Sequence, residues 1–277
     1  MLKAAAQCIQ EGICFPVLLG RSHEIAAAKE ALGLDFTCEE IDPREDPRRR
    51  GIYMEELQKK RGRKGITLPD ARRLLKSRVW FGSMMVEMGD ADGIIGGISR
   101  DYPEFLKPCL ATIGMDEDAH RVVGTYMMTI KGQLMFISDA TINIYPDART
   151  LAEIAVQTAR VARRFGIEPR VALLSFSNFG SSSQYRSERI EDSLEMAREL
   201  DPSLIIDGPM QADTALVPSI QEQYPFMTLG GPANVLICPN LASANISYKL
   251  LQRLGDAEMT GPILEGMAKP VHVLQRE

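Results

Sequence analysis

The sequence lacks the short motifs that mark several common enzyme classes. Its three histidines stand alone, without an H-E-x-x-H pair, and no serine lies in a G-x-S-x-G motif. The chain also has no G-x-G-x-x-G or Walker motif. We therefore expect no metal site, no common serine-hydrolase mechanism and no Rossmann-type dinucleotide site in these residues.

Cysteines and long apolar runs are also scarce. The five cysteines are odd in number, widely spread and free of any C-x-x-C pair, which argues against a disulfide framework or a structural zinc site. No run approaches the roughly 20 apolar residues of a membrane span, and the first residues lack the pattern of a signal peptide. We expect a cytoplasmic protein that does not associate with membranes.

The composition that remains is that of an average globular protein, with 45% hydrophobic and 25% charged residues. The net charge is -5, yet residues 44–64 hold nine basic residues against four acidic ones. Because the rest of the chain is acidic, general nucleic-acid binding is not expected. The basic segment is either a solvated helix followed by a turn or the binding surface for one polyanionic ligand.

Short apolar runs alternate with longer amphipathic stretches along the chain. The runs suited to buried strands are Phe15–Leu19, Gly93–Ile98, Val171–Phe176, Leu204–Ile206 and Val235–Cys238. This alternation predicts an α/β fold with mostly parallel sheets. Residues 122–139 depart from it, because Lys131-Gly132 separates two strand-like runs and predicts a β-hairpin. We place a boundary between two lobes near this hairpin.

Two helix starts carry capping patterns. Apolar residues at three- and four-residue spacing predict a helix over residues 151–165, with Thr150 and Glu153 as its capping box and Gly166 after its end. Thr67 and Asp70 give the same pattern at the start of another helix.

Loops that follow strands are where open α/β sheets bind their ligands. The four that stand out are residues 96–103, 175–183, 207–213 and 238–245. The Ser/Gly-rich loop at 175–183 leaves N–H groups and hydroxyls free for an anion, although tight turns are also rich in these residues. In the loop at 207–213, Asp213 either caps a helix or points into a cleft.

These segments together resemble the phosphotransacetylase (phosphate acetyltransferase) family. The similarity is carried by DGPMQAD from Asp207 and GGPANVLICPNLASANISYKLLQRLGD from Gly230, with KKRGRKGIT and DADGIIGGISRDYPEFLKP upstream. The chain is more similar still to the phosphotransacetylase-like C-terminal domain of bacterial multidomain NADP-dependent malic enzymes. The segments characteristic of that domain are SNFGSS, ISDATINIYPDARTLAEIA and AKPVHVL.

The resemblance implies two α/β/α lobes of the phosphotransacetylase and isocitrate-dehydrogenase type, with the second inserted into the first. The first lobe would comprise residues 1–122 and 267–277, and the second residues 123–266. The resemblance also implies a cleft between the lobes that accepts coenzyme A or acetyl-CoA. A homo-oligomer is implied as well, with a dimer formed through the second lobe.

The loops and the resemblance together assign ligand-binding roles to a set of polar and glycine residues. They are Lys107, Ser177, Asn178, Gly180, Ser181, Asn240, Asn245, Lys249, Arg253, Gln275 and Arg276. If the domain is catalytically active, we expect Arg253, Arg276 and Asp213 to take part in the reaction.

Three positions depart from the family pattern. Lys107 stands where active members carry an arginine that helps to bind the acyl phosphate, and lysine lacks the planar fork of that residue. Gln275 stands where the family has a serine that takes part in the transition state, and Ala140 stands where the family commonly has a cysteine. Because losing one oxyanion-type donor slows catalysis roughly 10²- to 10³-fold, these changes favour a pocket that binds without turnover.

Our leading hypothesis is therefore a regulatory domain of a malic enzyme that binds acetyl-CoA and supports oligomerisation. NADP, a divalent metal and the oxidative decarboxylation of malate to pyruvate would belong to N-terminal malic enzyme domains absent from this chain. The alternative is a working phosphate acetyltransferase, which converts acetyl phosphate and coenzyme A into acetyl-CoA and phosphate. A third hypothesis is a purely structural dimerisation module with a vestigial cleft.

Overall fold

The computed structural model describes residues 1–181 and 188–274 and divides into two compact units. Unit 1 comprises residues 1–114 and the segment from residue 268 onward, and unit 2 comprises residues 115–267. Residues 115–122 and Met267, which the resemblance places in the first lobe, belong to unit 2, because the two segments pair with each other and with residues of that unit. Met115 forms a β-bridge with Met267, and the Asp116 N–H donates to the Gly266 carbonyl at 3.0 Å.

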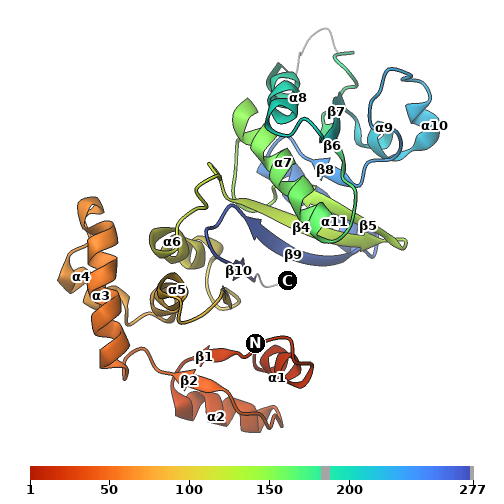
Figure 1. Cartoon of the computed structure of the whole chain (residues 1–277). Coiled ribbons are helices and arrows are strands. Elements are labelled where there is room, and N and C mark those ends of the chain that lie inside the picture. Colours follow the sequence, from red (N-terminus) through yellow and green to blue (C-terminus); the bar gives the residue numbers. More distant parts are fainter. Residues whose placement is uncertain (182–187, 275–277) are drawn as a thin grey trace. The chain divides into compact units, whose positions relative to one another are not determined.

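Unit 1 combines helices with two small sheets, both parallel, in the part that the structure describes (Figure 1). In the first sheet β1 pairs with β2, and in the second β10 pairs with β3. The elements are α1 (Leu2–Gln10), β1 (Val17–Leu19), α2 (Ser22–Ala31), β2 (Glu39–Ile41), α3 (Pro47–Arg61), a 3₁₀ turn (Gly62–Lys64), α4 (Leu68–Leu74), α5 (Arg78–Met88), β3 (Ile94–Gly96), α6 (Tyr102–Thr112) and β10 (Val271–Val273).

The core of unit 1 lies where α3, α4 and α5 meet. Tyr53, Leu57, Phe81 and Met84 are almost fully buried there. The predicted capping box at the start of α4 is confirmed: the Thr67 hydroxyl accepts the Asp70 N–H, and the Asp70 carboxylate accepts the Thr67 N–H. Such a reciprocal pair satisfies N–H groups that a helix start otherwise leaves without partners.

A lysine fastens the returning C-terminal segment to unit 1. The Lys269 ammonium donates to the carbonyls of Val86 at 2.8 Å and Glu87 at 3.1 Å, in the last turn of α5. The final carbonyls of a helix lack partners within the helix and carry partial negative charge, so a cation is favourable there.

Unit 2 is built on one six-stranded sheet with helices on both faces (Figure 1). The strand order is β7-β6-β8-β5-β4-β9, parallel from β7 to β5 and antiparallel across β4 and β9. The elements are β4 (Val123–Ile130), β5 (Gln133–Ser138), α7 (Ala148–Arg164), β6 (Arg170–Leu174), α8 (Glu188–Leu200), β7 (Ile205–Met210), α9 (Ala212–Leu216), α10 (Pro218–Gln221), β8 (Val235–Ile237), α11 (Leu241–Leu254) and β9 (Glu258–Glu265).

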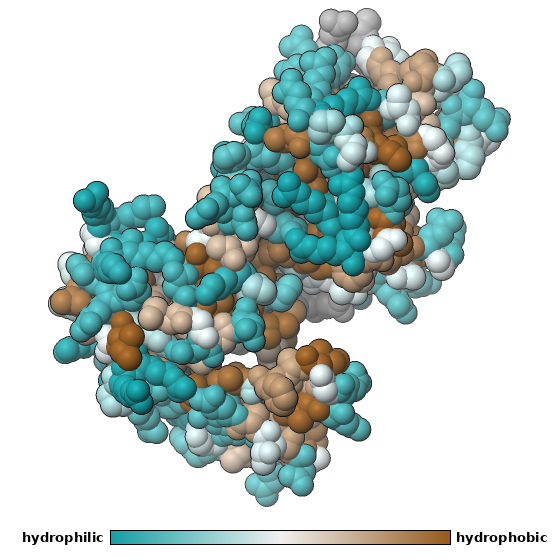
Figure 2. Space-filling view, viewed as in Figure 1, coloured by the Kyte–Doolittle hydropathy of each residue, from teal (hydrophilic) through white to brown (hydrophobic). Residues whose placement is uncertain are grey.

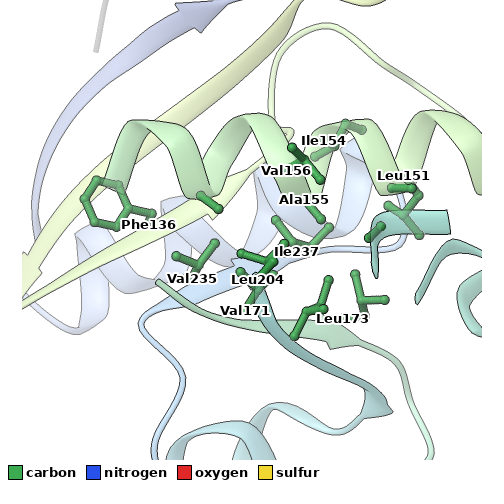
Figure 3. Packing of buried hydrophobic residues seen from close by; sticks show 14 of the residues in the cluster. Phe136, Leu151, Ile154, Ala155, Val156, Val171, Leu173, Leu204, Val235 and Ile237 are labelled. Carbon is green, nitrogen blue, oxygen red and sulfur yellow. The ribbon is translucent and has the colours of Figure 1, made fainter. Parts of the chain in front are cut away.

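Two apolar layers hold this sheet between its helices. On one face, Leu151, Ile154 and Ala155 of α7 pack against sheet residues such as Val171 and Ile237 (Figure 3). On the other face, α9 and α11 cover a second cluster in which Tyr126 and Tyr248 stack with ring centroids 4.4 Å apart. The predicted α/β fold with mostly parallel sheets is thus observed. Hydrophilic side chains cover most of the face shown in Figure 2, with smaller apolar patches between them.

The predicted hairpin lies at β4 and β5, and its turn residues Lys131 and Gly132 both have positive φ, as a two-residue hairpin turn requires. The capping box predicted for α7 is wrong. The helix begins at Ala148 with Asp147 as its N-cap, because the Asp147 carboxylate accepts the Thr150 N–H at 2.8 Å. Glu153 instead pairs with Arg149 at 3.0 Å.

Candidate functional site

One pocket of unit 1 combines positive charge with an apolar floor, and we call it the α6 pocket. Its volume is about 470 Å³. The cations that line it are Arg61 at the end of α3, Lys64 in the 3₁₀ turn and Lys107 in α6. The floor consists of partly or fully buried apolar side chains. They are Ile66, Leu74, Trp80, Leu106, Leu110 and Ala111.

The local sequence explains how these side chains come together. After α3 ends at Arg61, Gly65 has a φ of +89°, which lets the chain reverse before the capped start of α4. In α6, Leu110 and Ala111 follow Lys107 by three and four positions, so the three residues share one helix face. The lysine and part of the apolar floor are therefore held by the same rigid element.

The cations of the α6 pocket carry uncompensated charge. Among the residues that the structure describes, no carboxylate forms an ion pair with Arg61, Lys64 or Lys107, and no acidic residue lines the pocket. The neighbouring Lys59 and Lys60 differ, because they pair with Glu56 and Glu87. A phosphate group would meet three positive side chains here without competition from a protein carboxylate.

Sequence motifs assign a ligand-binding role in this pocket to Lys107 but leave Arg61 and Lys64 open between two interpretations. The signal that points to them is the dense basic run Lys60-Arg61-Gly62-Arg63-Lys64. Only the fold separates the run into residues that line the pocket and residues that do not. Part of the basic segment thus faces a pocket rather than open solvent.

The paired glycines before α6 are explained by packing. A Cβ at Gly96 would lie 2.4 Å from the ring of Phe105, and one at Gly97 would lie 2.6 Å from the carbonyl of Leu274. The Leu274 N–H also donates to the Gly96 carbonyl at 2.6 Å. Gly96 thus leaves room for Phe105 of α6, and Gly97 leaves room for the end of β10 and the residue that follows it, so the structure gives both glycines a role that needs no ligand.

In unit 2, the loop after β6 brings several predicted residues together. Asn178 organises it: its side-chain carbonyl accepts the Gln211 N–H at 2.7 Å, and its amide donates to the Tyr224 hydroxyl at 3.1 Å. Gly180 has a φ of +74°, and the Ser181 N–H donates to the Asn178 carbonyl at 2.8 Å. Asn178 therefore shapes the loop by contacts within the protein.

Ser177 lies in the same loop and is only 5% exposed. Its hydroxyl has no hydrogen-bond partner among the described residues. Because buried hydroxyls are nearly always paired, an unpaired one marks a place where a ligand or a water molecule could bind.

The residues predicted after β8 lie along α11. Asn240 is its N-cap and accepts the Ser243 N–H at 2.9 Å. Asn245 donates to the Ala140 carbonyl at 3.3 Å, which ties α11 to the loop after β5. Lys249 lies 5.1 Å from the Tyr248 ring centroid, whereas Arg253 is exposed in the last turn. The spacing of four places Asn245, Lys249 and Arg253 on one helix face.

The loop expected at residues 207–213 is in part wrong, because residues 207–210 complete β7 (Ile205–Met210) and α9 begins at Ala212. The two carboxylates of this segment have different surroundings. Asp207 is 7% exposed and accepts the N–H and the hydroxyl of Thr228 at 2.6 and 3.0 Å, so it is a structural residue. Asp213 is exposed in the first turn of α9, whose N-cap is Gln211. The interpretation of Asp213 as the helix cap is therefore wrong.

A buried carboxylate fixes the loop after β5. Asp139 is 3% exposed and accepts backbone N–H groups of Gly124, Thr141, Ile142 and Asn143 at distances between 2.9 and 3.3 Å. The Asn143 side chain adds a further hydrogen bond of 2.6 Å. Ala140, one of the positions that depart from the family pattern, is held inside this network.

A second pocket lies at the start of α7 and mixes charges of both signs. Its volume is about 440 Å³, and its lining includes His120, Arg121 and Arg149 together with Asp147 and Glu153. Glu153 already pairs with Arg149, and Asp147 already caps the helix. An anion would therefore be opposed by two carboxylates here, and the α6 pocket is the better anion site.

The remaining predictions concern thiols, metals, membranes and two C-terminal residues. Burial raises the pKa of the Cys109 and Cys238 thiols to about 12, so both stay protonated near neutral pH. Among residues 1–181 and 188–274, no group of three or more His, Cys, Asp or Glu side chains is placed to hold a metal ion, and no helix is long and apolar enough to cross a membrane. Gln275 and Arg276 lie outside the described residues.

The predicted residues are divided between the units. Lys107 belongs to unit 1, and those at positions 177–253 belong to unit 2. Within unit 2, the predicted residues at positions 177–181 lie in the loop after β6, and those at positions 240–253 lie at the start of α11 and along it.

Comparison with known proteins gives consistent results. A family model described as "Phosphate acetyl/butaryl transferase" matches residues 1–277. The chain is 38% identical to the phosphate acetyltransferase of Corynebacterium glutamicum, over 100% of this chain and 84% of that protein. It is also 39% identical to the NADP-dependent malic enzyme of Escherichia coli, over 99% of this chain but 37% of that protein.

Solved structures agree in fold. A phosphotransacetylase from Streptococcus pyogenes matches with a TM-score of 0.93 and 36% identity, covering 100% of this chain and 84% of that one. The EutD phosphotransacetylase from Staphylococcus aureus matches with a TM-score of 0.90 and 32% identity, covering 99% and 84%.

Proposed function

Because this chain belongs to the phosphate acetyl/butaryl transferase family, we propose that it transfers an acetyl group between phosphate and coenzyme A. The observation that carries this proposal is the α6 pocket, where Arg61, Lys64 and Lys107 offer unpaired positive charge. Phosphate acetyltransferases with 35–39% identity, of which the chain covers 84–86%, support the same activity.

The proposed reaction is a single acyl transfer. The thiol sulfur of coenzyme A attacks the carbonyl carbon of acetyl phosphate, a C–S bond forms, and the bond from that carbon to the phosphate oxygen breaks. Inorganic phosphate leaves, and the thiol proton passes to solvent or to an acceptor, for which the exposed Asp213 is a candidate. Positive side chains at the phosphate stabilise the charge that grows on the leaving group.

We propose unit 2 as the part that binds coenzyme A. Arg253 and Lys249 on α11 would contact its phosphates, and the free hydroxyl of Ser177 would donate to a polar group of the ligand. We further propose that the protein forms a homodimer through unit 2. The exposed apolar side chains Ile246, Leu250 and Leu254 of α11 support this, because a stripe of such residues is typical of a protein interface.

A regulatory domain of a malic enzyme is the second candidate function, and Lys107 is the observation that favours it. A lysine holds phosphate as a point charge, without the fork that arginine provides, and Ala140 removes a thiol. The identity of 39% to malic enzymes is as high as that to phosphate acetyltransferases. Such a domain would bind acetyl-CoA without turning it over.

Two measurements on the same preparation separate these functions. The first follows thioester formation from acetyl phosphate and coenzyme A, and the second titrates acetyl-CoA into the protein by calorimetry. Turnover in the usual range of about 1–10³ s⁻¹ supports the acetyltransferase. Acetyl-CoA binding without turnover would favour the regulatory domain. If the protein shows no binding of acetyl-CoA and no turnover, that result would contradict both functions.

A further inference from the structure

Lys107 brings a nucleophilic group to the place where the proposed substrate would bind. It is an exposed residue of the α6 pocket and shares a helix face with Leu110 and Ala111 of the apolar floor. A lysine amine can attack a carbonyl carbon and form a covalent bond to it. The pocket therefore places a group that can be modified beside the site for the phosphate.

Several other lysines already have partners within the protein. Lys29 and Lys60 each form an ion pair with a glutamate, and Lys269 donates to two carbonyls at the end of α5. These lysines must break such contacts before they can react. Within residues 1–181 and 188–274, Lys107 has no contact of this kind to break.

The three cations of the pocket differ in what they can do chemically. Acetyl phosphate is a mixed anhydride, so its carbonyl carbon reacts with amines as well as with thiols. An arginine side chain keeps its proton, so Arg61 supplies charge but no nucleophile. Lys64 has an amine, but it lies in the 3₁₀ turn, whereas Lys107 lies on the helix that supplies part of the apolar floor. Because the acetyl methyl favours that floor, Lys107 is the amine placed beside it.

We infer that acetyl phosphate bound in the α6 pocket acetylates Lys107. The amine nitrogen attacks the carbonyl carbon, and an amide bond forms. The bond from that carbon to the phosphate oxygen breaks, inorganic phosphate leaves with the electron pair, and a proton of the amine passes to solvent. This inference rests on the proposed function, which supplies the reactant.

Acetylation would weaken the pocket for its own substrate. The modified side chain has lost its positive charge, so we expect acetyl phosphate to bind roughly 10- to 100-fold more weakly. The modification would accumulate when acetyl phosphate is abundant and coenzyme A is scarce, because coenzyme A then does not remove the acetyl group.

Peptide mass spectrometry tests the inference directly. The protein is incubated without coenzyme A, with acetyl phosphate that carries heavy isotopes in its acetyl group, and the labelled fraction of each lysine is followed over time. We expect the rate at Lys107 to saturate with acetyl phosphate concentration, because binding comes first. It should also be at least about tenfold higher than at Lys76, an exposed lysine outside the pocket. Equal rates at the two lysines, no labelling of Lys107 or preferred labelling of Lys64 overturns the inference.

Two further reagents show whether the pocket directs the reaction. Added inorganic phosphate should slow labelling at Lys107 and leave Lys76 unaffected, since it competes for the same cations. The acetyl ester of N-hydroxysuccinimide has no phosphate group, so it should label both lysines at similar rates. If phosphate gives no protection, or if the ester shows the same preference for Lys107, the pocket does not direct the reaction and the inference is wrong.

A pair of matched variants and a turnover assay distinguish this inference from the proposed function. Lys107→Arg keeps the charge but has no amine to acetylate, and Lys76→Arg makes the same change outside the pocket. Incubation with acetyl phosphate should raise the KM of the parent protein and of Lys76→Arg but not that of Lys107→Arg, and an equal rise in all three contradicts the inference. Turnover without selective labelling of Lys107 would refute this inference alone. Selective labelling without turnover would support it and refute the proposed catalysis.

Discussion

Lys107 is the residue at which the proposed chemistry can be tested most directly. Removing one hydrogen bond to a charged group costs about 1.5–3 kcal/mol, so we expect Lys107→Ala to raise the KM for acetyl phosphate roughly 10- to 100-fold. Lys107→Arg should lower the KM, because the guanidinium grips phosphate through two parallel hydrogen bonds. Steady-state kinetics with varied acetyl phosphate measures both effects.

Lys76 provides the control, because it is an exposed lysine of unit 1 that does not line the α6 pocket. Lys76→Ala should leave the KM unchanged. If Lys107→Ala also leaves it unchanged, phosphate is not bound at this pocket.

The carboxylate of Asp139 is expected to contribute to the folding stability of the protein. It accepts hydrogen bonds from the backbone N–H groups of four residues, one buried and three partly buried, and Asp139→Ala would remove the partner of each. We expect the free energy of unfolding to fall by about 3 kcal/mol or more. Urea denaturation followed by circular dichroism measures the change, with the exposed Asp118→Ala as a control expected to stay within about 0.5 kcal/mol. A loss as small as that of the control would show that the network contributes little.

The contrast between Lys60 and Arg61 shows why part of the site escapes sequence reasoning. Both belong to one basic run, yet Lys60 pairs with Glu87 and Arg61 lines the pocket. The difference depends on where α5 and α6 pack, which no local pattern encodes. Lys107 could be predicted because the family resemblance supplied its position. Asn178 could be predicted as a loop residue, but the sequence does not show that its side chain forms hydrogen bonds to Gln211 and Tyr224.

At the scale of elements, the N-cap of α7, Asp147, makes the stability of the protein depend on pH. Hydrogen bonds from the side chain and backbone of Thr150 lower the pKa of Asp147, with smaller contributions from Arg121 and Arg189. A lowered folded-state pKa means that Asp147 stabilises the protein above the ordinary aspartate pKa of about 3.9. This stabilisation is lost as the pH falls from there through the folded-state value. We expect Asp147→Ala to cost about 1 kcal/mol at pH 7 and progressively less below pH 4.

Urea denaturation of both proteins between pH 2 and 7 measures this dependence. The exposed Asp192→Ala should leave the pH profile as it is. A difference between Asp147→Ala and the parent protein that is the same at pH 2 and pH 7 would contradict the N-cap as its source.

Helices and strands with a clear local sequence pattern could be predicted, and those without such a pattern could not. The apolar runs at β1, β3, β6, β7 and β8 and the turn of the β4–β5 hairpin all identify themselves in the sequence. The strand β2 contains Glu39 and Glu40, and β9 contains Gly261 and Pro262, so neither has an apolar pattern. At α7 two residues three positions apart could each cap the helix, and periodicity cannot choose between Asp147 and Thr150.

For the whole molecule, the testable property is oligomeric state. Ile246, Leu250 and Leu254 follow one another at four-residue spacing on α11 and are 58%, 52% and 80% exposed. A two-fold dimer that buries this stripe twice would be disrupted by a charge at its centre. We expect Leu250→Glu to lower the sedimentation coefficient from that of a dimer toward that of a monomer in sedimentation-velocity runs. The matched Leu32→Glu in unit 1 should leave it unchanged. A dimer that persists in Leu250→Glu would exclude this face.

The insertion of unit 2 into unit 1 also sets an order for folding during synthesis. All strands of unit 2 lie between residues 123 and 265, so its sheet is complete once that stretch has left the ribosome. In unit 1, β3 pairs with β10, and the α5 carbonyls receive Lys269, both made more than 150 residues after α5. The part that is translated first therefore finishes folding last, and a nascent chain halted before residue 269 would expose an unpaired β3 to chaperones and proteases.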